Sequence, residues 1–133
     1  MTLYVDSSAL LKRYVDEHDS EAAVGLMATD PVLVTCRLTE VEVRRNLTRL
    51  LDGSALAASR RQFSQDLDVF ALVAVDAVTC NEAARIAEQT LCRSLDAIHV
   101  ASALRAGPTT TLLTFDLRQA QTARTLGLHV IGS

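Results

Sequence analysis

The sequence predicts an α/β protein with a mostly parallel sheet of roughly five strands and helices on both faces. Two observations predict this fold. Short, continuous apolar runs, typical of strands that are covered on both faces, alternate along the chain with longer stretches of helical periodicity. The length of 133 residues, of which 49% are hydrophobic, also matches one domain with an ordinary core, so we expect a single domain over residues 1–133.

Each expected strand is a run of three to five residues rich in Leu, Val, Ile and Thr, which suit a buried sheet. The first begins two residues after Met1, and the last is followed by two residues, Gly132 and Ser133. The five runs span residues 3–5, 32–35, 72–75, 111–115 and 129–131.

The expected helices carry apolar residues at spacings of three and four, as Leu10, Leu11 and Tyr14 do in the first of them. Turn residues separate them: Asp52-Gly53-Ser54 lies between the third and fourth, and Gly127 ends the seventh. The seven stretches span residues 8–15, 21–29, 38–51, 55–70, 81–91, 95–105 and 117–126.

Composition excludes several classes of protein. A net charge of −3 argues against binding of nucleic acid by bulk positive charge, and 4% aromatic residues without tryptophan argue against an open base-stacking platform. The start shows no signal peptide, and no apolar run approaches the ~20 residues of a membrane-spanning helix. We therefore expect a cytoplasmic protein that makes no use of a membrane.

The three cysteines, Cys36, Cys80 and Cys92, are odd in number and lack the CxxC spacing of a redox or zinc motif. A disulfide framework and a zinc site are both disfavoured. We expect the three thiols to be small, buried, apolar groups.

Two aspartates follow predicted strands directly: Asp6 comes after the first strand and Asp116 after the fourth. In parallel sheets, functional sites lie at the carboxyl ends of the strands, so both side chains are candidates. Either one, taken alone, has a purely structural explanation, because aspartate is a favoured N-cap of the helix that follows.

Three further acids lie near helix starts. Asp96 begins a helix whose apolar stripe includes Val100 and Ala103, so its carboxylate lies at one end of an inward face, where a charged group needs a partner such as a metal. Glu40 and Glu42 are two residues apart and therefore point to opposite sides of their helix, so only one of them can face a site.

The acids taken together are more informative than each alone. Carboxylates converging on one edge of the sheet would repel one another, and clusters made only of oxygen ligands are what Mg²⁺ or Mn²⁺ selects. Such an ion polarises a phosphate and activates a water, which is the chemistry of phosphodiester hydrolysis.

Three segments resemble the motifs of PIN-domain ribonucleases, and most closely those of the VapC toxins of bacterial toxin–antitoxin pairs. The segments are Val5-Asp6-Ser7-Ser8-Ala9-Leu10-Leu11-Lys12, then Leu95-Asp96-Ala97-Ile98-His99-Val100-Ala101-Ser102-Ala103-Leu104, and Leu112-Leu113-Thr114-Phe115-Asp116 with residues 123–128. The resemblance covers the whole chain. It implies a three-layer α/β/α sandwich, a Mg²⁺- or Mn²⁺-dependent endoribonuclease, and a VapB-type antitoxin that blocks the site. It also suggests a homodimer that assembles with the antitoxin into a hetero-oligomer.

By position, the resemblance implies a set of four catalytic and metal-binding acids: Asp6, Glu42, Asp96 and Asp116. A shift of two residues in the alignment would select Glu40 in place of Glu42. Two hydroxyl residues match supporting positions: Ser7 beside the first acid, and Thr114, which is suited to orient a water or a carboxylate. His99 lies three residues after Asp96, and we interpret it as a structural histidine in preference to a general acid.

Two alternatives to a nuclease stay open. A non-catalytic module of the same fold would use its acidic cleft to receive a basic partner peptide. A phosphotransfer domain would use a strand-end aspartate as nucleophile, but Asp6-Ser7-Ser8 lacks the second aspartate two residues on that a haloacid-dehalogenase-like pattern has.

Charge is unevenly distributed along the chain. Residues 37–61 contain six arginines against three acids, a local net charge of +3. Arginine suits bidentate phosphate contacts, so this segment is a candidate rim that guides RNA. Ordinary solvated helix faces with ion pairs along the helix explain the same residues equally well.

Overall fold

The computed structural model describes residues 2–29 and 32–133. Within these ranges, five strands form one sheet in the order β3-β2-β1-β4-β5, and every neighbouring pair is parallel. The strands are β1 (Thr2–Val5), β2 (Leu33–Cys36), β3 (Ala71–Val73), β4 (Thr110–Leu113) and β5 (His129–Ile131). The predicted α/β class and parallel sheet are confirmed.

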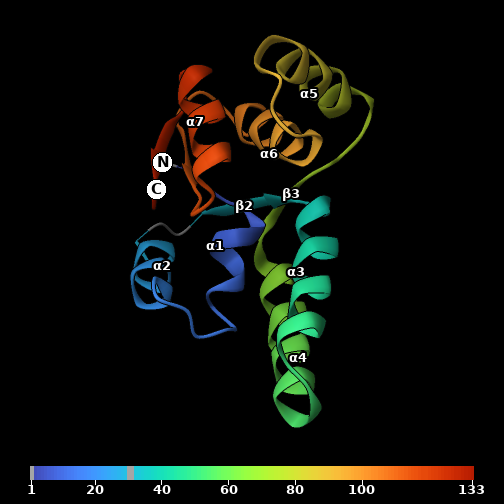
Figure 1. The fold of residues 1–133 in the computed structure, drawn as a ribbon, viewed down its shortest axis with the longest axis vertical. Coiled ribbons are helices and arrows are strands. Elements are labelled where there is room, and N and C mark those ends of the chain that lie inside the picture. Colours follow the sequence, from blue (N-terminus) through green and yellow to red (C-terminus); the bar gives the residue numbers. More distant parts are fainter. Residues whose placement is uncertain (1, 30–31) are drawn as a thin grey trace.

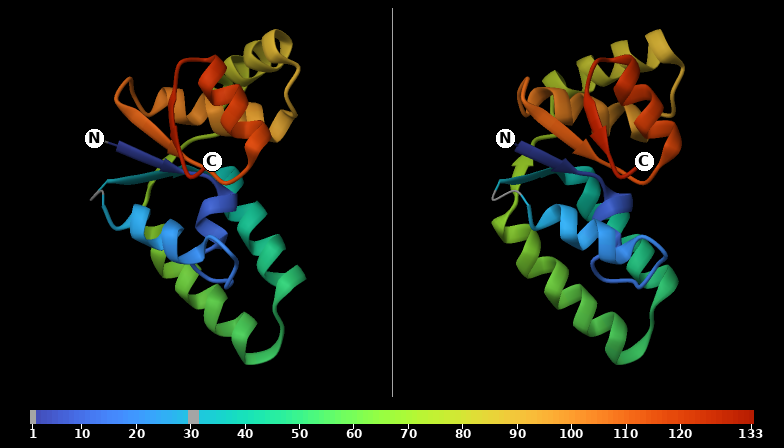
Figure 2. Two further views of the ribbon diagram at one scale, coloured as in Figure 1. Left: turned by 60° about the vertical axis from the view of Figure 1, so that its left-hand side comes forward. Right: turned by 90° about the vertical axis from the view of Figure 1, so that its left-hand side faces the viewer.

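Helices cover both faces of the sheet (Figures 1 and 2). Four helices pack on one face: α1 (Ser7–Leu11), α2 (Ser20–Met27), α3 (Arg37–Leu50) and α4 (Gly53–Val69). Three pack on the other: α5 (Ala77–Thr90), α6 (Ser94–Arg105) and α7 (Leu117–Thr125). The arrangement is the three-layer sandwich that the resemblance implied.

Successive side chains of the central strands point to opposite faces of the sheet, so the interior has two hydrophobic cores, one on each face. Tyr4 and Leu112 contact the layer of α5 to α7, whereas Val5 and Leu113 contact the layer of α1 to α4. All four side chains are fully buried. Because both faces of β1 and β4 are covered, their sequences do not alternate between apolar and polar residues, which explains why these strands could be recognised in the sequence.

The order of the strands creates a switch point between β1 and β4. From β1 the chain moves outward to β2 and β3, then crosses back to β4 and moves outward again to β5. Val5 of β1 pairs with Leu113 of β4, so Asp6 and Thr114, the residues that follow, lie side by side at the carboxyl edge of the sheet. Ligand sites of open α/β sheets lie at this kind of point.

Two predicted helices differ from the observed ones by four residues at one end, and the other five by at most two residues. The first ends at Leu11 and not at residue 15, because the chain continues in turns and the Ser20 hydroxyl donates to the carbonyl of Val15. The fifth begins at Ala77 and not at residue 81, because the carboxylate of Asp76 caps it by accepting from the amide of Thr79 (3.1 Å).

The expectation for the cysteines holds only in part. All three are free, and Cys36 is buried, but Cys80 is exposed and Cys92 is half-buried. Cys80 lies on α5, which packs against α6 and leaves its own outer side in solvent. Among the described residues, no helix combines the length and the apolar character that a bilayer crossing requires.

Helices α3 and α4 form a hairpin that extends well beyond the sheet (Figure 1). Leu47 of α3 is fully buried in the core on this side of the sheet, whereas Leu50, three residues further on, is 39% exposed. The root of the hairpin is therefore part of the core, and its tip is a solvent-exposed projection.

We expect Leu47→Ala to lower the free energy of unfolding by about 2–5 kcal/mol, because it leaves a cavity in this core. Leu50→Ala is the matched control and should cost less than about 1 kcal/mol, since its side chain is already partly in water. Urea unfolding followed by circular dichroism at one protein concentration measures both. Equal losses in the two variants would contradict the assignment of the core.

Candidate active site at the carboxyl edge of the sheet

A cavity of about 240 Å³ lies at the switch point between β1 and β4. It receives side chains from the carboxyl ends of both strands and from α3, α6 and α7. All four acids implied by the resemblance line it: Asp6, Glu42, Asp96 and Asp116. Four carboxylates that are far apart in the sequence thus share one cavity.

Asp6 is the most deeply buried of the four acids, with 2% of its surface exposed. Its carboxylate accepts hydrogen bonds from Ser8 Oγ (2.8 Å), the amide of Ala9 (2.9 Å), Thr114 Oγ1 (2.6 Å) and Gln119 Nε2 (2.6 Å). Burial raises the pKa of Asp6, and the charge of His99 and the hydrogen bonds from Thr114, Ala9 and Ser8 oppose the rise. Asp6 caps α1, so its structural and candidate functional roles coincide.

Glu42 faces the cavity and Glu40 does not. Glu42 Oε1 accepts from Ser7 Oγ (3.0 Å) and lies 2.6 Å from His99 Nε2. Glu40 is on another side of α3, where it pairs with Arg37 (3.0 Å) and Arg44 (3.6 Å). The geometry therefore favours Glu42 over Glu40 as the glutamate of the site. Ser7 holds the Glu42 carboxylate through its hydrogen bond.

His99 is buried at 2% exposure, with contacts on both ring nitrogens. Tyr4 Oη lies 2.9 Å from Nδ1, and Glu42 lies at Nε2. Burial by itself would lower the pKa of His99, but hydrogen bonds to Cys36 and Glu42 and the negative charge of Asp6 outweigh it and raise the pKa. Both ring nitrogens thus have partners, and the ring holds a carboxylate of the site in place.

Arg93 joins the remaining two acids. Its guanidinium donates from Nε to Asp96 Oδ2 (2.8 Å) and from Nη2 to Asp116 Oδ2 (2.9 Å). Asp96 is 4% exposed, in the first turn of α6. Asp116 caps α7 by accepting from the amides of Arg118 (3.0 Å) and Gln119 (3.2 Å). A cation of the chain itself therefore lies between two acids of the cavity.

Sequence reasoning missed Arg93 and Gln119. Arg93 lies three residues before Asp96, a spacing that permits an ion pair at the start of a helix. Gln119 lies three residues after the helix cap Asp116, which is the spacing of a capping box, but its side chain turns inward to Asp6. Only the fold shows that these two residues belong to the site.

The donor chemistry of the cavity fits a hard divalent cation, since all four acids offer oxygen. As the side chains stand, no group of three His, Cys, Asp or Glu residues in ranges 2–29 and 32–133 is arranged to hold a metal ion. Arg93 accounts for part of this arrangement, because its guanidinium occupies oxygens of Asp96 and Asp116. The side chain of Arg93 is half-exposed, directly before the first turn of α6.

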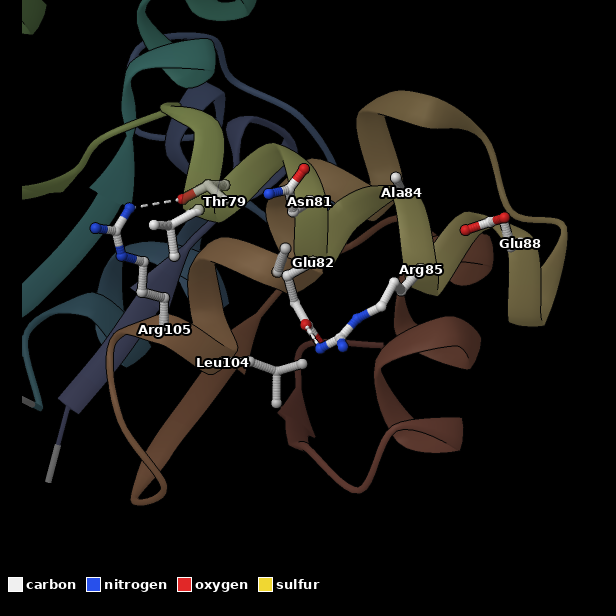
Figure 3. A pocket seen from close by; sticks show the side chains of 10 residues that line it. Thr79, Asn81, Glu82, Ala84, Arg85, Glu88, Leu104 and Arg105 are labelled. Carbon is white, nitrogen blue, oxygen red and sulfur yellow. Dashed lines mark hydrogen bonds and ion pairs between the residues drawn. The ribbon is translucent and has the colours of Figure 1, made fainter.

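A larger cavity, of about 750 Å³, lies between α5 and α6, away from the four acids (Figure 3). Three of its four charged lining residues are already paired: Arg85 with Glu82, and Arg105 with Asp76 and Thr79. By volume alone, this cavity would be the candidate active site. The convergence of carboxylates favours the smaller cavity as the candidate active site instead.

The fold and the site have the features of a PIN domain, and comparison with known families agrees. The model of the PIN domain family matches residues 3–125. The chain therefore belongs to the PIN domain family, and the resemblance noted in its motifs is confirmed.

Three known proteins illustrate the relationship. Ribonuclease VapC35 and ribonuclease VapC46 of Mycobacterium tuberculosis are 37% and 39% identical to this chain, and each alignment covers 97% of this chain and 95% of the relative. A toxin–antitoxin complex from Klebsiella pneumoniae has a chain of the same fold, with a TM-score of 0.67, 16% identity and 87% of both chains covered.

We expect Thr114→Val to lower the free energy of unfolding by about 1.5–3 kcal/mol, because it removes a donor from the buried carboxylate of Asp6. The measurement is urea unfolding without divalent cations. Thr125→Val is the control: its hydroxyl donates to a backbone carbonyl at an exposed position, so its loss should stay within about 0.5 kcal/mol. A Thr114→Val variant as stable as this control would show that the hydroxyl does not support Asp6.

Proposed function

We propose that this chain is the toxin of a toxin–antitoxin pair and acts as a metal-dependent endoribonuclease. The observation that carries the proposal is the convergence of Asp6, Glu42, Asp96 and Asp116 on one cavity at the switch point of the sheet. The names of the relatives VapC35 and VapC46, both ribonucleases, support the reaction class. The RNA is a substrate of unspecified sequence.

The four acids would hold Mg²⁺ or Mn²⁺. When bound, such an ion activates a water and neutralises charge on the scissile phosphodiester. The residues of the chain prepare this site in advance. Asp6 is held by donors from α1, from α7 and from Thr114 at the end of β4. Glu42 is held by Ser7 and His99. Asp116 is held by the backbone amides in the first turn of α7. Carboxylates held in this way need little rearrangement during the reaction.

A VapB-type antitoxin is the proposed partner, which is consistent with the toxin–antitoxin complex among the structural relatives. A basic antitoxin side chain inserted between Asp96 and Asp116 would take the position that Arg93 has here. We further propose a homodimer that assembles with the antitoxin and acts on cytoplasmic RNA.

One observation supports a second candidate function. The guanidinium of Arg93 already lies between two acids, so the cleft is suited to a basic side chain even without catalysis. A non-catalytic module of this kind would bind a basic partner peptide in the cleft. It would show no metal-dependent turnover of RNA.

We expect Asp96→Asn and Glu42→Gln to reduce RNA cleavage by about 100-fold or more, because each removes a charged oxygen from the metal site while keeping the shape of the side chain. Glu40→Gln is the matched control on α3, and it should keep full activity because Glu40 lies outside the cavity. The assay is cleavage of a labelled RNA by antitoxin-free protein, with and without Mg²⁺.

Circular dichroism of each variant shows whether it is folded. Full activity in excess chelator, or in folded Asp96→Asn protein, would contradict the proposed reaction. Tight binding of a basic peptide without any turnover would favour the non-catalytic module. Loss of activity in Glu40→Gln together with retention in Glu42→Gln would exchange the roles of the two glutamates.

We expect Arg93→Ala to tighten Mn²⁺ binding by about five- to thirtyfold, because the ion no longer competes with two partly exposed ion pairs worth ~0.5–1 kcal/mol each. Isothermal titration calorimetry measures the affinity directly. Arg118→Ala removes the same charge from α7 without touching either ion pair, and should change the affinity much less. Equal effects in the two variants would mean that only overall charge is involved.

A further inference from the structure

A polar stripe runs along α3 away from the candidate active site. Arg45, Asn46 and Arg49 follow Glu42 at positions i+3, i+4 and i+7. At 100° per residue, Arg49 lies about 20° around the helix from Glu42, and Arg45 about 60°. Arg44, by contrast, lies about 160° away, on the opposite side of the same helix. Four of the six arginines of residues 37–61 lie on α3, and the helix places them on different faces.

Asn46 holds the stripe together. Its Nδ2 donates to the backbone carbonyl of Glu42 (3.0 Å), and its Oδ1 accepts from Arg49 Nε (3.2 Å) and from Arg45 Nη1 (3.4 Å). One amide thus links both guanidinium groups to the turn of helix that presents Glu42 to the cavity. The two arginines are one helical turn apart, about 4.5 and 10.5 Å beyond Glu42 along the helix axis.

The charges of these two arginines are uncompensated. Neither Arg45 nor Arg49 forms an ion pair with any described carboxylate, and both side chains are exposed. The arginines on the other side of α3 are different, because Arg37 and Arg44 both pair with Glu40. Two guanidinium groups without a carboxylate partner therefore lie along α3 beyond a cavity lined by four carboxylates.

We propose that Arg45 and Arg49 form a phosphate-binding track that carries single-stranded RNA to the active site. The inference rests on the proposed function and names residues that position its substrate. Arginine matches phosphate in charge and in hydrogen-bond geometry, and successive phosphates of one strand supply the repeated anions that two aligned arginines need. The track offsets the repulsion that the acids of the cavity exert on a polyanion.

The composition of the stripe favours RNA over a protein partner. Protein segments that dock on helices depend on apolar anchors seated in pockets. The stripe of Glu42, Arg45, Asn46 and Arg49 contains no apolar side chain. Cations on a polar, exposed surface suit a phosphate backbone, which binds through charge and without sequence readout.

The test is binding of a fluorescently labelled single-stranded RNA to the full chain, measured by anisotropy over a series of salt concentrations. All proteins carry Asp96→Asn, so that the RNA stays intact. We expect Arg45→Ala/Arg49→Ala to weaken binding about tenfold or more near physiological salt. The slope of log affinity against log salt should fall by about 1.4, since each lost contact to a single-strand phosphate removes ~0.7.

The control is Arg37→Ala/Arg44→Ala, which removes the same charge from the same helix but on the side paired with Glu40. It should change affinity less than about twofold. In protein with the native Asp96, the track variant should raise KM and leave kcat close to its original value, as expected for a residue that binds substrate away from the reacting atoms.

Equal losses and equal salt slopes in the two double variants would overturn the proposal, because only overall charge would then be involved. An effect of Arg45→Ala/Arg49→Ala on antitoxin affinity, with RNA affinity unchanged, would assign the stripe to a protein partner and would also overturn it. Failure of the proposed function looks different. In that case, protein with native Asp96 does not cleave RNA at all, whatever residues occupy positions 45 and 49.

Discussion

The buried carboxylate of Asp6 is the constraint on which the rest of this molecule depends. A charge at 2% exposure is stable only if it is surrounded by donors, and Asp6 draws them from α1, β4 and α7. These contacts join the first strand, the fourth strand and the last helix at the switch point of the sheet. The hydrogen bonds that hold these elements together therefore also fix the geometry of the candidate active site.

The other three acids meet the same requirement in different ways. Glu42 is held by Ser7 and by the buried ring of His99, while Asp96 and Asp116 share the guanidinium of Arg93. Each carboxylate has at least one donor, so four acids can line one cavity without a prohibitive repulsion. Without these four acids the chain would carry a net charge of +1 in place of −3, so its overall acidity reflects one site. A negative total is therefore compatible with a polyanionic substrate.

The sequence predicted the class of fold, the strands close to their observed places and the acids that line the cavity. It succeeded with the strands because burial on both faces leaves continuous apolar runs, and with Asp6 and Asp116 because strand ends carry functional residues in parallel sheets. It misjudged the start of α5 because the cap at Asp76 went unrecognised, and it overestimated the burial of Cys80. Those errors concern exposed positions, where packing leaves little pattern in the sequence.

By itself, then, the sequence determined the alternation of strands and helices and the residue types of the site, since both follow from local patterns of apolar and acidic residues. Only the tertiary structure decided which glutamate enters the cavity and which arginines are left unpaired. It also brought Arg93 and Gln119 to carboxylates up to 113 residues away. Those choices depend on how α3, α6 and α7 are rotated against the sheet. The rotation of a helix about its axis is determined by the packing of the whole core, so the sequence of one segment does not predict it.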